Sequence, residues 1–168
     1  MPTLSAGATN RSHGQGGVTM IEMLIVMTLI ALVAGISYPS AASGLSSLRL
    51  RAASDAIVSF LTTAADRADR RQQAVEIVIA PEANMLFARS SDRGFFQRLE
   101  VPEPVRIVAV RPPLLNAAPD DARPRRFLIY PGGAAPRLGI EIANADGRRR
   151  LVTIDPLSGF PRVEILTP

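Results

Sequence analysis

The longest apolar run of the chain covers residues 18–38, which are 21 positions with one charged residue, Glu22, followed by Pro39. At 1.5 Å per residue, a helix over this run is about 31 Å long and matches a hydrocarbon core of about 30 Å. The run therefore predicts a transmembrane helix. A cleaved secretory signal peptide is the alternative, but its apolar core is shorter, about 7–15 residues, and follows a basic start.

Beyond Pro39, apolar residues recur at steps of three and four, which is the period of an amphipathic helix. Residues 39–73 are therefore predicted to continue the first helix, giving one helix from about Val18 to about Gln72. Because proline removes a helical hydrogen bond, we expect a kink near Pro39 and loosening near Gly44. The predicted apolar stripe consists of Leu45, Leu48, Ala52, Ala56, Ile57, Phe60, Leu61, Ala64 and Ala68.

Short alternating segments separated by turn residues fill the remainder, residues 74–168. Turn residues at Pro81–Asn84 and Asn144–Gly147 predict two hairpins. Strands with such short connections form an antiparallel sheet, so the predicted fold class is α+β, with the long helix packed on one face of the sheet. The predicted strands are Val75–Ala80, Met85–Ser90, Arg106–Val110, Arg126–Tyr130, Leu138–Ala143, Arg150–Asp155 and Arg162–Leu166.

The composition argues against most enzyme chemistry. The chain has 168 residues and 19 basic residues, all of them Arg, with no Cys and a single His at His13. It therefore lacks a lysine for a Schiff base and a thiolate, and its only imidazole lies in the first 17 residues. We expect a protein that is not an enzyme and needs no cofactor. The net charge of +4 is too small to indicate nucleic-acid binding by itself.

The polar, Gly-rich residues 1–17 precede the apolar run and contain one charge, Arg11. The segment from Gly17 to Val26, with Glu22 inside it, resembles the processing motif of type IV pilins and type II secretion pseudopilins, although that family prefers Phe at the position of Val18. The resemblance implies that residues 1–17 are a leader peptide. A membrane aspartyl peptidase would cut between Gly17 and Val18 and methylate Val18, and Glu22 would be the signature acid of assembly.

Glu22 has two interpretations. A carboxylate inside a membrane costs up to about 3 kcal/mol when it is central, so it usually has a partner or lies near the headgroups. Cleavage after Gly17 would create an α-amino cation one helical turn away. The same cation on a neighbouring subunit could neutralise Glu22, and the resemblance favours this role.

Three later segments, 64–75, 127–133 and 152–159, are similar to those of H-type pseudopilins and FimT-like minor pilins. The resemblance implies a structural subunit at or near the tip of the periplasmic pseudopilus of a type II secretion system. It would be a single-pass inner-membrane protein with a periplasmic C-terminal domain. Its partners would be other pseudopilins, the prepilin peptidase/methyltransferase and inner-membrane lipid. The alternative is a FimT-like minor pilin of a type IV pilus, in which arginines contact DNA.

Two other clusters are weaker candidate sites. Asp120 and Asp121 in the loop 112–124 could begin a calcium site, but they supply too few oxygens for the six to eight ligands of Ca²⁺, so we expect no metal. Arg148, Arg149 and Arg150 could form a phosphate-binding patch with Arg123, Arg125 and Arg126. Because aromatic residues are few nearby, a solvated hairpin or a subunit contact is favoured over nucleic acid.

Overall fold

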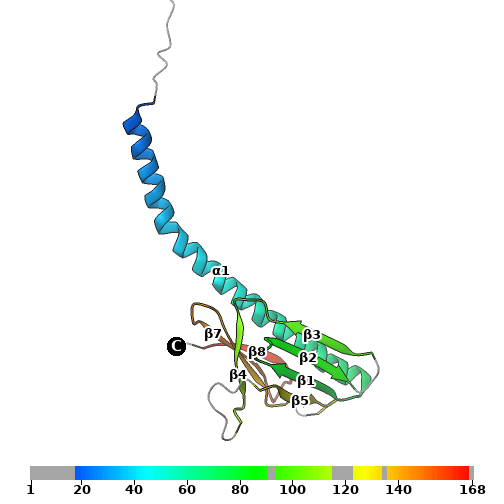
Figure 1. Cartoon of the computed structure of the whole chain (residues 1–168). Coiled ribbons are helices and arrows are strands. Elements are labelled where there is room, and N and C mark those ends of the chain that lie inside the picture. The colour runs from blue at the N-terminus through cyan, green and yellow to red at the C-terminus, as the bar shows by residue number, and fades with distance from the viewer. Residues whose placement is uncertain (1–17, 91–93, 115–122, 134–135, 167–168) are drawn as a thin grey trace, which may run out of the picture. The chain divides into compact units, whose positions relative to one another are not determined.

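The computed structural model describes the backbone of residues 18–90, 94–114, 123–133 and 136–166, and the side chains of these residues except 36–43. The chain divides into two compact units, 1–40 and 41–168. Helix α1 (Met20–Arg71) contributes its first part to one unit and the rest to the other (Figure 1). The long helix predicted from about Val18 to about Gln72 is therefore present. It passes through Pro39 and Gly44 as one element, and the kink near Pro39 and the loosening near Gly44 stay predictions.

The second unit contains two antiparallel sheets of four strands each (Figure 1). The first sheet has the order β3-β2-β1-β5, and the second has the order β4-β6-β7-β8. The strands of the first sheet are β1 (Val75–Ala80), β2 (Met85–Ser90), β3 (Phe96–Glu100) and β5 (Arg125–Ile129). Those of the second are β4 (Arg106–Arg111), β6 (Gly139–Ala143), β7 (Arg149–Ile154) and β8 (Pro161–Leu166).

The α+β class and both predicted hairpins are confirmed, with β1 paired to β2 and β6 paired to β7. The expectation of one sheet is wrong. Strand β4 follows β3 in the chain but does not pair with it, and instead pairs with β6 in the second sheet. Strand β3 was not predicted. It is an edge strand whose inward positions include the polar Gln97, so its hydrophobic alternation is weak.

The core of the second unit forms where the helix meets both sheets. Buried side chains of α1 between Leu50 and Ala68 belong to the same apolar cluster as Ile77 of β1 and Ile140 of β6. The predicted stripe is correct from Ile57 onward but wrong at its start. Leu48 is 64% exposed, whereas Leu50 is 3% exposed. Steps of three and four residues fit a stripe that begins at Leu48 as well as one that begins at Leu50. The position of the sheets determines that the second stripe is buried.

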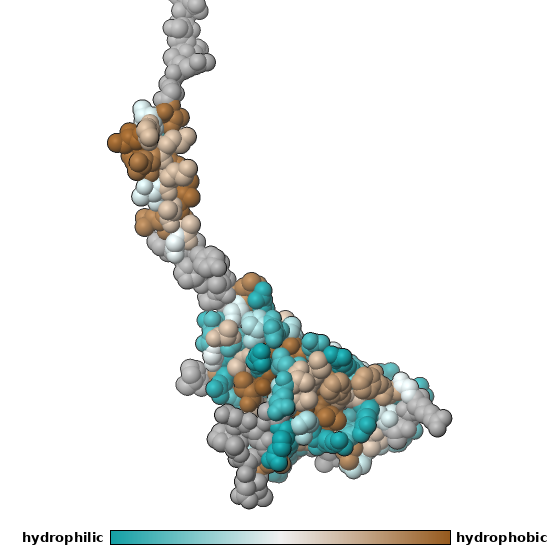
Figure 2. Space-filling view, viewed as in Figure 1, coloured by the Kyte–Doolittle hydropathy of each residue, from teal (hydrophilic) through white to brown (hydrophobic). Residues whose placement is uncertain are grey.

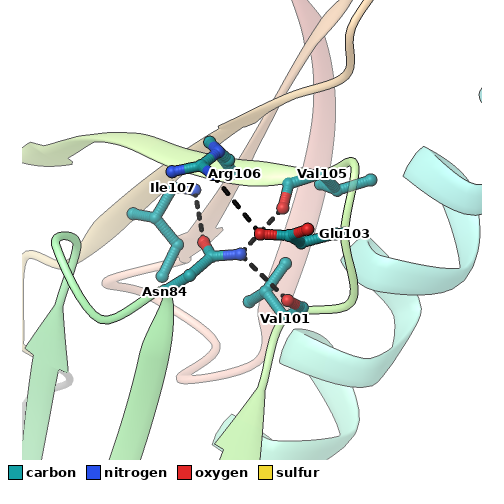
Figure 3. A network of polar contacts seen from close by, with 6 residues as sticks. All are labelled: Asn84, Val101, Glu103, Val105, Arg106 and Ile107. Atoms are coloured by element: carbon teal, nitrogen blue, oxygen red, sulfur yellow. Dashed lines mark hydrogen bonds and ion pairs between the residues drawn. The ribbon is translucent and has the colours of Figure 1, made fainter.

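Asn84 joins the two sheets at the β1–β2 turn (Figure 3). Its backbone is left-handed, with φ of +52°, a conformation that Asn tolerates better than most residues. The Nδ2 group donates to the carbonyls of Val101 and Val105 at 2.9 and 2.8 Å, and Oδ1 accepts the N–H of Ile107 at 2.9 Å. This amide therefore fixes the connection that carries the chain from β3 into β4 of the other sheet.

Substituting Asn84→Ala should destabilise the second unit by about 2–4 kcal/mol, because it leaves three backbone polar groups without partners and puts Ala in the left-handed region. Urea unfolding of a fragment of residues 41–168, followed by circular dichroism, measures the change. The matched control is Glu103→Ala, which removes an exposed ion pair with Arg106 in the β3–β4 connection that Asn84 contacts and should change stability by less than about 1 kcal/mol. Equal midpoints for the two variants would contradict the role given to Asn84.

Candidate functional site

The first turn of α1 is capped by Thr19. The Oγ1 atom of Thr19 accepts the backbone N–H of Glu22 at 3.3 Å, and its carbonyl accepts the N–H of Met23 at 3.2 Å. Thr19 and Glu22 thus occupy the N-cap and N3 positions, which is the spacing of a capping box, and the acid complements the positive end of the helix dipole. Thr19 is the residue of this segment that the sequence analysis missed, although the Thr-x-x-Glu spacing could have shown it.

Apolar side chains are exposed along the first part of α1. Figure 2 shows this apolar surface on one face of the helix. Met20 is 89% exposed and Ile21 is 70% exposed, and the apolar residues that follow are also exposed. The described residues contain no helix that is both long and apolar enough to cross a membrane. The predicted span over 18–38 is therefore not shown, and the side chains of its last three residues lie outside the description.

The other predicted residues of the processing motif fall partly outside the described residues. Gly17 and the rest of the leader, 1–17, are outside them. Val18 is described and is 61% exposed, and Glu22 lies in the exposed first turn of α1. The cleavage position, the methylation of Val18 and the assembly role of Glu22 stay predictions.

One comparison with known proteins supports this segment. A family model described as the prokaryotic N-terminal methylation motif matches residues 12–38. The chain has a type IV pilin-like N-terminus. Such a motif indicates processing by a prepilin peptidase and assembly with other pilins, and it usually anchors a protein in the inner membrane. No curated protein and no solved structure matches the chain.

The six arginines of the predicted cluster fall into two groups, one at β5 of the first sheet and one at the β6–β7 connection of the second sheet. Arg123 and Arg148 lie in the connections and not in the strands themselves. Arg125 and Arg126 are on β5 of the first sheet, where Arg125 lies 5.5 Å from the centroid of the Phe127 ring and Arg126 NH1 lies 3.7 Å from Glu76 Oε1. Arg148, Arg149 and Arg150 follow the β6–β7 turn in the second sheet. The structure therefore brings together the triplet but does not place all six in one sheet.

Two arginines of the triplet are bonded to α1. The Arg150 NH1 group donates to Ser54 Oγ at 3.2 Å, and Arg148 NH1 donates to Ser47 Oγ. The Ser54 hydroxyl is fully buried and donates in turn to the Arg51 carbonyl at 2.7 Å. These contacts fix the β6–β7 turn to the helix, and the sequence analysis did not predict the two serines.

The third arginine of the triplet belongs to an ion-paired group on the second sheet. Glu141 on the central strand β6 is 4% exposed, and its two oxygens accept from Arg149 at 3.0 Å and from Arg111 at 3.1 Å. A buried carboxylate needs such partners, since an unpaired one is strongly disfavoured. Arg149 is thus held by charge pairing, in contrast to Arg148 and Arg150.

Asp155 organises the β7–β8 turn. The backbone N–H groups of Leu157 and Ser158 donate to its Oδ1 at 2.8 and 3.3 Å, and Arg162 contacts its other oxygen. These backbone hydrogen bonds, with a further contribution from Arg162, lower the pKa of the Asp155 carboxyl below its usual value. A lowered pKa stabilises the fold above the ordinary pKa of Asp, and this contribution is lost as the pH falls through the lowered value.

The candidate metal site gains no support. Among the residues that the structure describes, no group of three or more His, Cys, Asp or Glu side chains is placed to hold a metal ion. Asp120 and Asp121 lie outside the described residues.

Gly17→Arg should block processing and leave the 17-residue leader attached, because the peptidase of this family requires a small residue before the cut. N-terminal sequencing of the protein extracted from membranes measures the result, and the unchanged chain should begin at Val18. Arg11→Gln, which keeps the Gly17–Val18 junction, serves as the control and should be processed. If the unchanged chain began at any other residue, the predicted junction would be wrong.

Proposed function

We propose that this chain is an H-type minor pseudopilin of a type II secretion system, a structural subunit at or near the tip of the periplasmic pseudopilus. The observation that carries the proposal is the methylation motif matched over residues 12–38. The α+β unit of a helix on antiparallel sheets is consistent with a pilin-like fold. The resemblance of residues 64–75, 127–133 and 152–159 to H-type pseudopilins supports the subtype.

In this proposal the apolar run 18–38 first anchors the subunit in the inner membrane and later packs in the filament. The exposure of its apolar side chains supports both roles, because an apolar helical surface is stable only when lipid or other helices cover it. The leader lies in the cytoplasm and the sheets lie in the periplasm. The other pseudopilins, the prepilin peptidase/methyltransferase and inner-membrane lipid are the partners.

The proposed subunit is not an enzyme. The mature chain from Val18 contains no His, Cys or Lys, so general acid–base and nucleophilic mechanisms that use those side chains are closed to it. The role rests instead on surfaces that contact other subunits.

A FimT-like minor pilin of a type IV pilus is the second candidate, and the cationic β6–β7 turn is the observation that favours it. Arg148, Arg149 and Arg150 follow Gly147, whose positive φ of +79° forms the tight turn. In a DNA-uptake pilus these groups would contact phosphates. Gene neighbours distinguish the two candidates, since a secretin and a secretion ATPase accompany one and retraction and competence genes accompany the other.

Glu22→Val should leave membrane insertion and cleavage intact but reduce entry into filaments, because the carboxylate pairs with the α-amino group of a neighbouring subunit inside the helix bundle. Cross-linking to the other pseudopilins measures entry. Glu22→Asp keeps the charge and is the matched control, with a smaller loss expected. Unchanged cross-linking of the Val variant would show that Glu22 has no pairing role and lies at headgroup depth.

A soluble fragment that begins near Ser40 should show no salt-sensitive DNA binding near physiological ionic strength, because a secretion pseudopilin has no need of phosphate contacts. Fluorescence anisotropy with a labelled duplex across a salt series measures it. The comparison variant changes Arg148, Arg149 and Arg150 to Ala, and circular dichroism checks that it folds. Micromolar binding that this variant loses would replace the secretion proposal with the minor-pilin one.

A further inference from the structure

A slot of about 580 Å³ opens between α1, the β6–β7 turn and the end of β8. Ser47 and Leu50 of the helix line one side of the slot, and Ile165 of β8 forms its apolar floor. Arg148, Arg149 and Arg150 surround it together with one acid, Asp146. The slot lies within the second unit.

The apolar floor of the slot is an uncovered part of the core face of the second sheet. Val152 pairs with Val163, and both pack in or against the core. Arg150 pairs with Ile165 two positions along the same strands, so the Ile165 side chain is on this same face. Ile165 is nevertheless 75% exposed, while neighbouring Leu50 is buried. The slot can therefore bury a further apolar side chain against Ile165.

The cations of the slot are held in place without being neutralised. Within the described residues, Arg148 and Arg150 donate to the hydroxyls of Ser47 and Ser54, and neither has an ion pair with a carboxylate. Most other described arginines are paired with acids, as Arg149 and Arg111 are with Glu141. A hydroxyl fixes a guanidinium but leaves its full charge available. Two pre-positioned guanidinium groups therefore favour a ligand with carboxylates.

We propose that this slot docks an acidic segment of another pilin-like subunit, which places one apolar side chain on Ile165 and carboxylates beside Arg148 and Arg150. The inference rests on the proposed function and names the chemistry of the partner. A duplex would satisfy the two cations but would leave the apolar floor uncovered. Among the described residues that line the slot, none is an aromatic residue on which a base could stack. Both features favour a protein segment over nucleic acid.

A photo-cross-linking amino acid at Ile165 of the full-length chain tests this in cells that express the complete set of pilin-like subunits. It replaces one apolar side chain with another, so the floor of the slot is kept. We expect an adduct with a pilin-like subunit at a peptide rich in Asp and Glu. Arg148→Gln with Arg150→Gln should lower its yield about tenfold or more, since losing one partner of a close charge pair is costly.

Matched variants separate charge from folding. Arg148→Lys with Arg150→Lys keeps both charges and should retain most of the adduct. Arg98→Gln with Arg106→Gln removes two exposed ion-paired cations outside the slot and should leave the yield unchanged. Equal Tm values for the Gln and Lys pairs would show that the loss reflects the missing charge.

Three results would overturn the inference: no adduct, a yield that the Gln pair does not change, or an adduct that nuclease removes. The last result would assign the slot to nucleic acid. N-terminal sequencing of the same protein distinguishes a failure of the slot inference from a failure of the proposed function. A chain that begins at Val18 and enters filaments, yet gives no charge-dependent adduct at Ile165, contradicts the slot alone.

Discussion

The packing of α1 between Leu50 and Ala68 is the constraint on which the rest of the second unit depends. Among the described residues, the buried apolar side chains of both sheets, with the exception of Leu151, form one cluster with this stripe of the helix. Polar contacts align the helix at both ends of the stripe. Ser46 and Ser54 bond to Asn144 and Arg150 of the second sheet, and Asp69 Oδ1 accepts the N–H of Gly132 after β5 at 2.9 Å. The helix thus supports both sheets, whose described strands do not pair with one another across the two sheets.

Local signals explain what the sequence could predict. The hairpins β1–β2 and β6–β7 follow from turn residues between alternating segments, and the helix follows from a period that continues over many residues. The assignment of strands to two sheets does not follow from such signals. It depends on Asn84, whose side chain bonds to groups 17 to 23 residues away. The sequence showed Asn84 only as a turn residue, since its partners become visible only when the chain is folded.

The candidate sites divide in the same way. The processing motif is contiguous, so the motif could be recognised from the sequence, and the roles of Gly17, Val18 and Glu22 within it stay predictions. The slot is not contiguous, because Ser47 and Ser54 meet Arg148 and Arg150 across 101 and 96 residues. Three adjacent arginines looked equivalent in the sequence. The fold separates them, since Glu141 pairs with Arg149 and leaves the other two to hydroxyl groups.

This difference in partners connects stability to function. Arg149 and Arg111 satisfy the buried acid Glu141, and this carboxylate partly neutralises both of them. A serine–arginine bond contributes a modest hydrogen bond to the fold and keeps the guanidinium both oriented and cationic. If the second sheet needed only to be held on α1, a carboxylate on the helix would hold Arg148 or Arg150 more strongly. Ser47 and Ser54 hold the two arginines less strongly than a carboxylate would. The charge that they leave unneutralised lies beside an apolar surface that the described residues leave exposed.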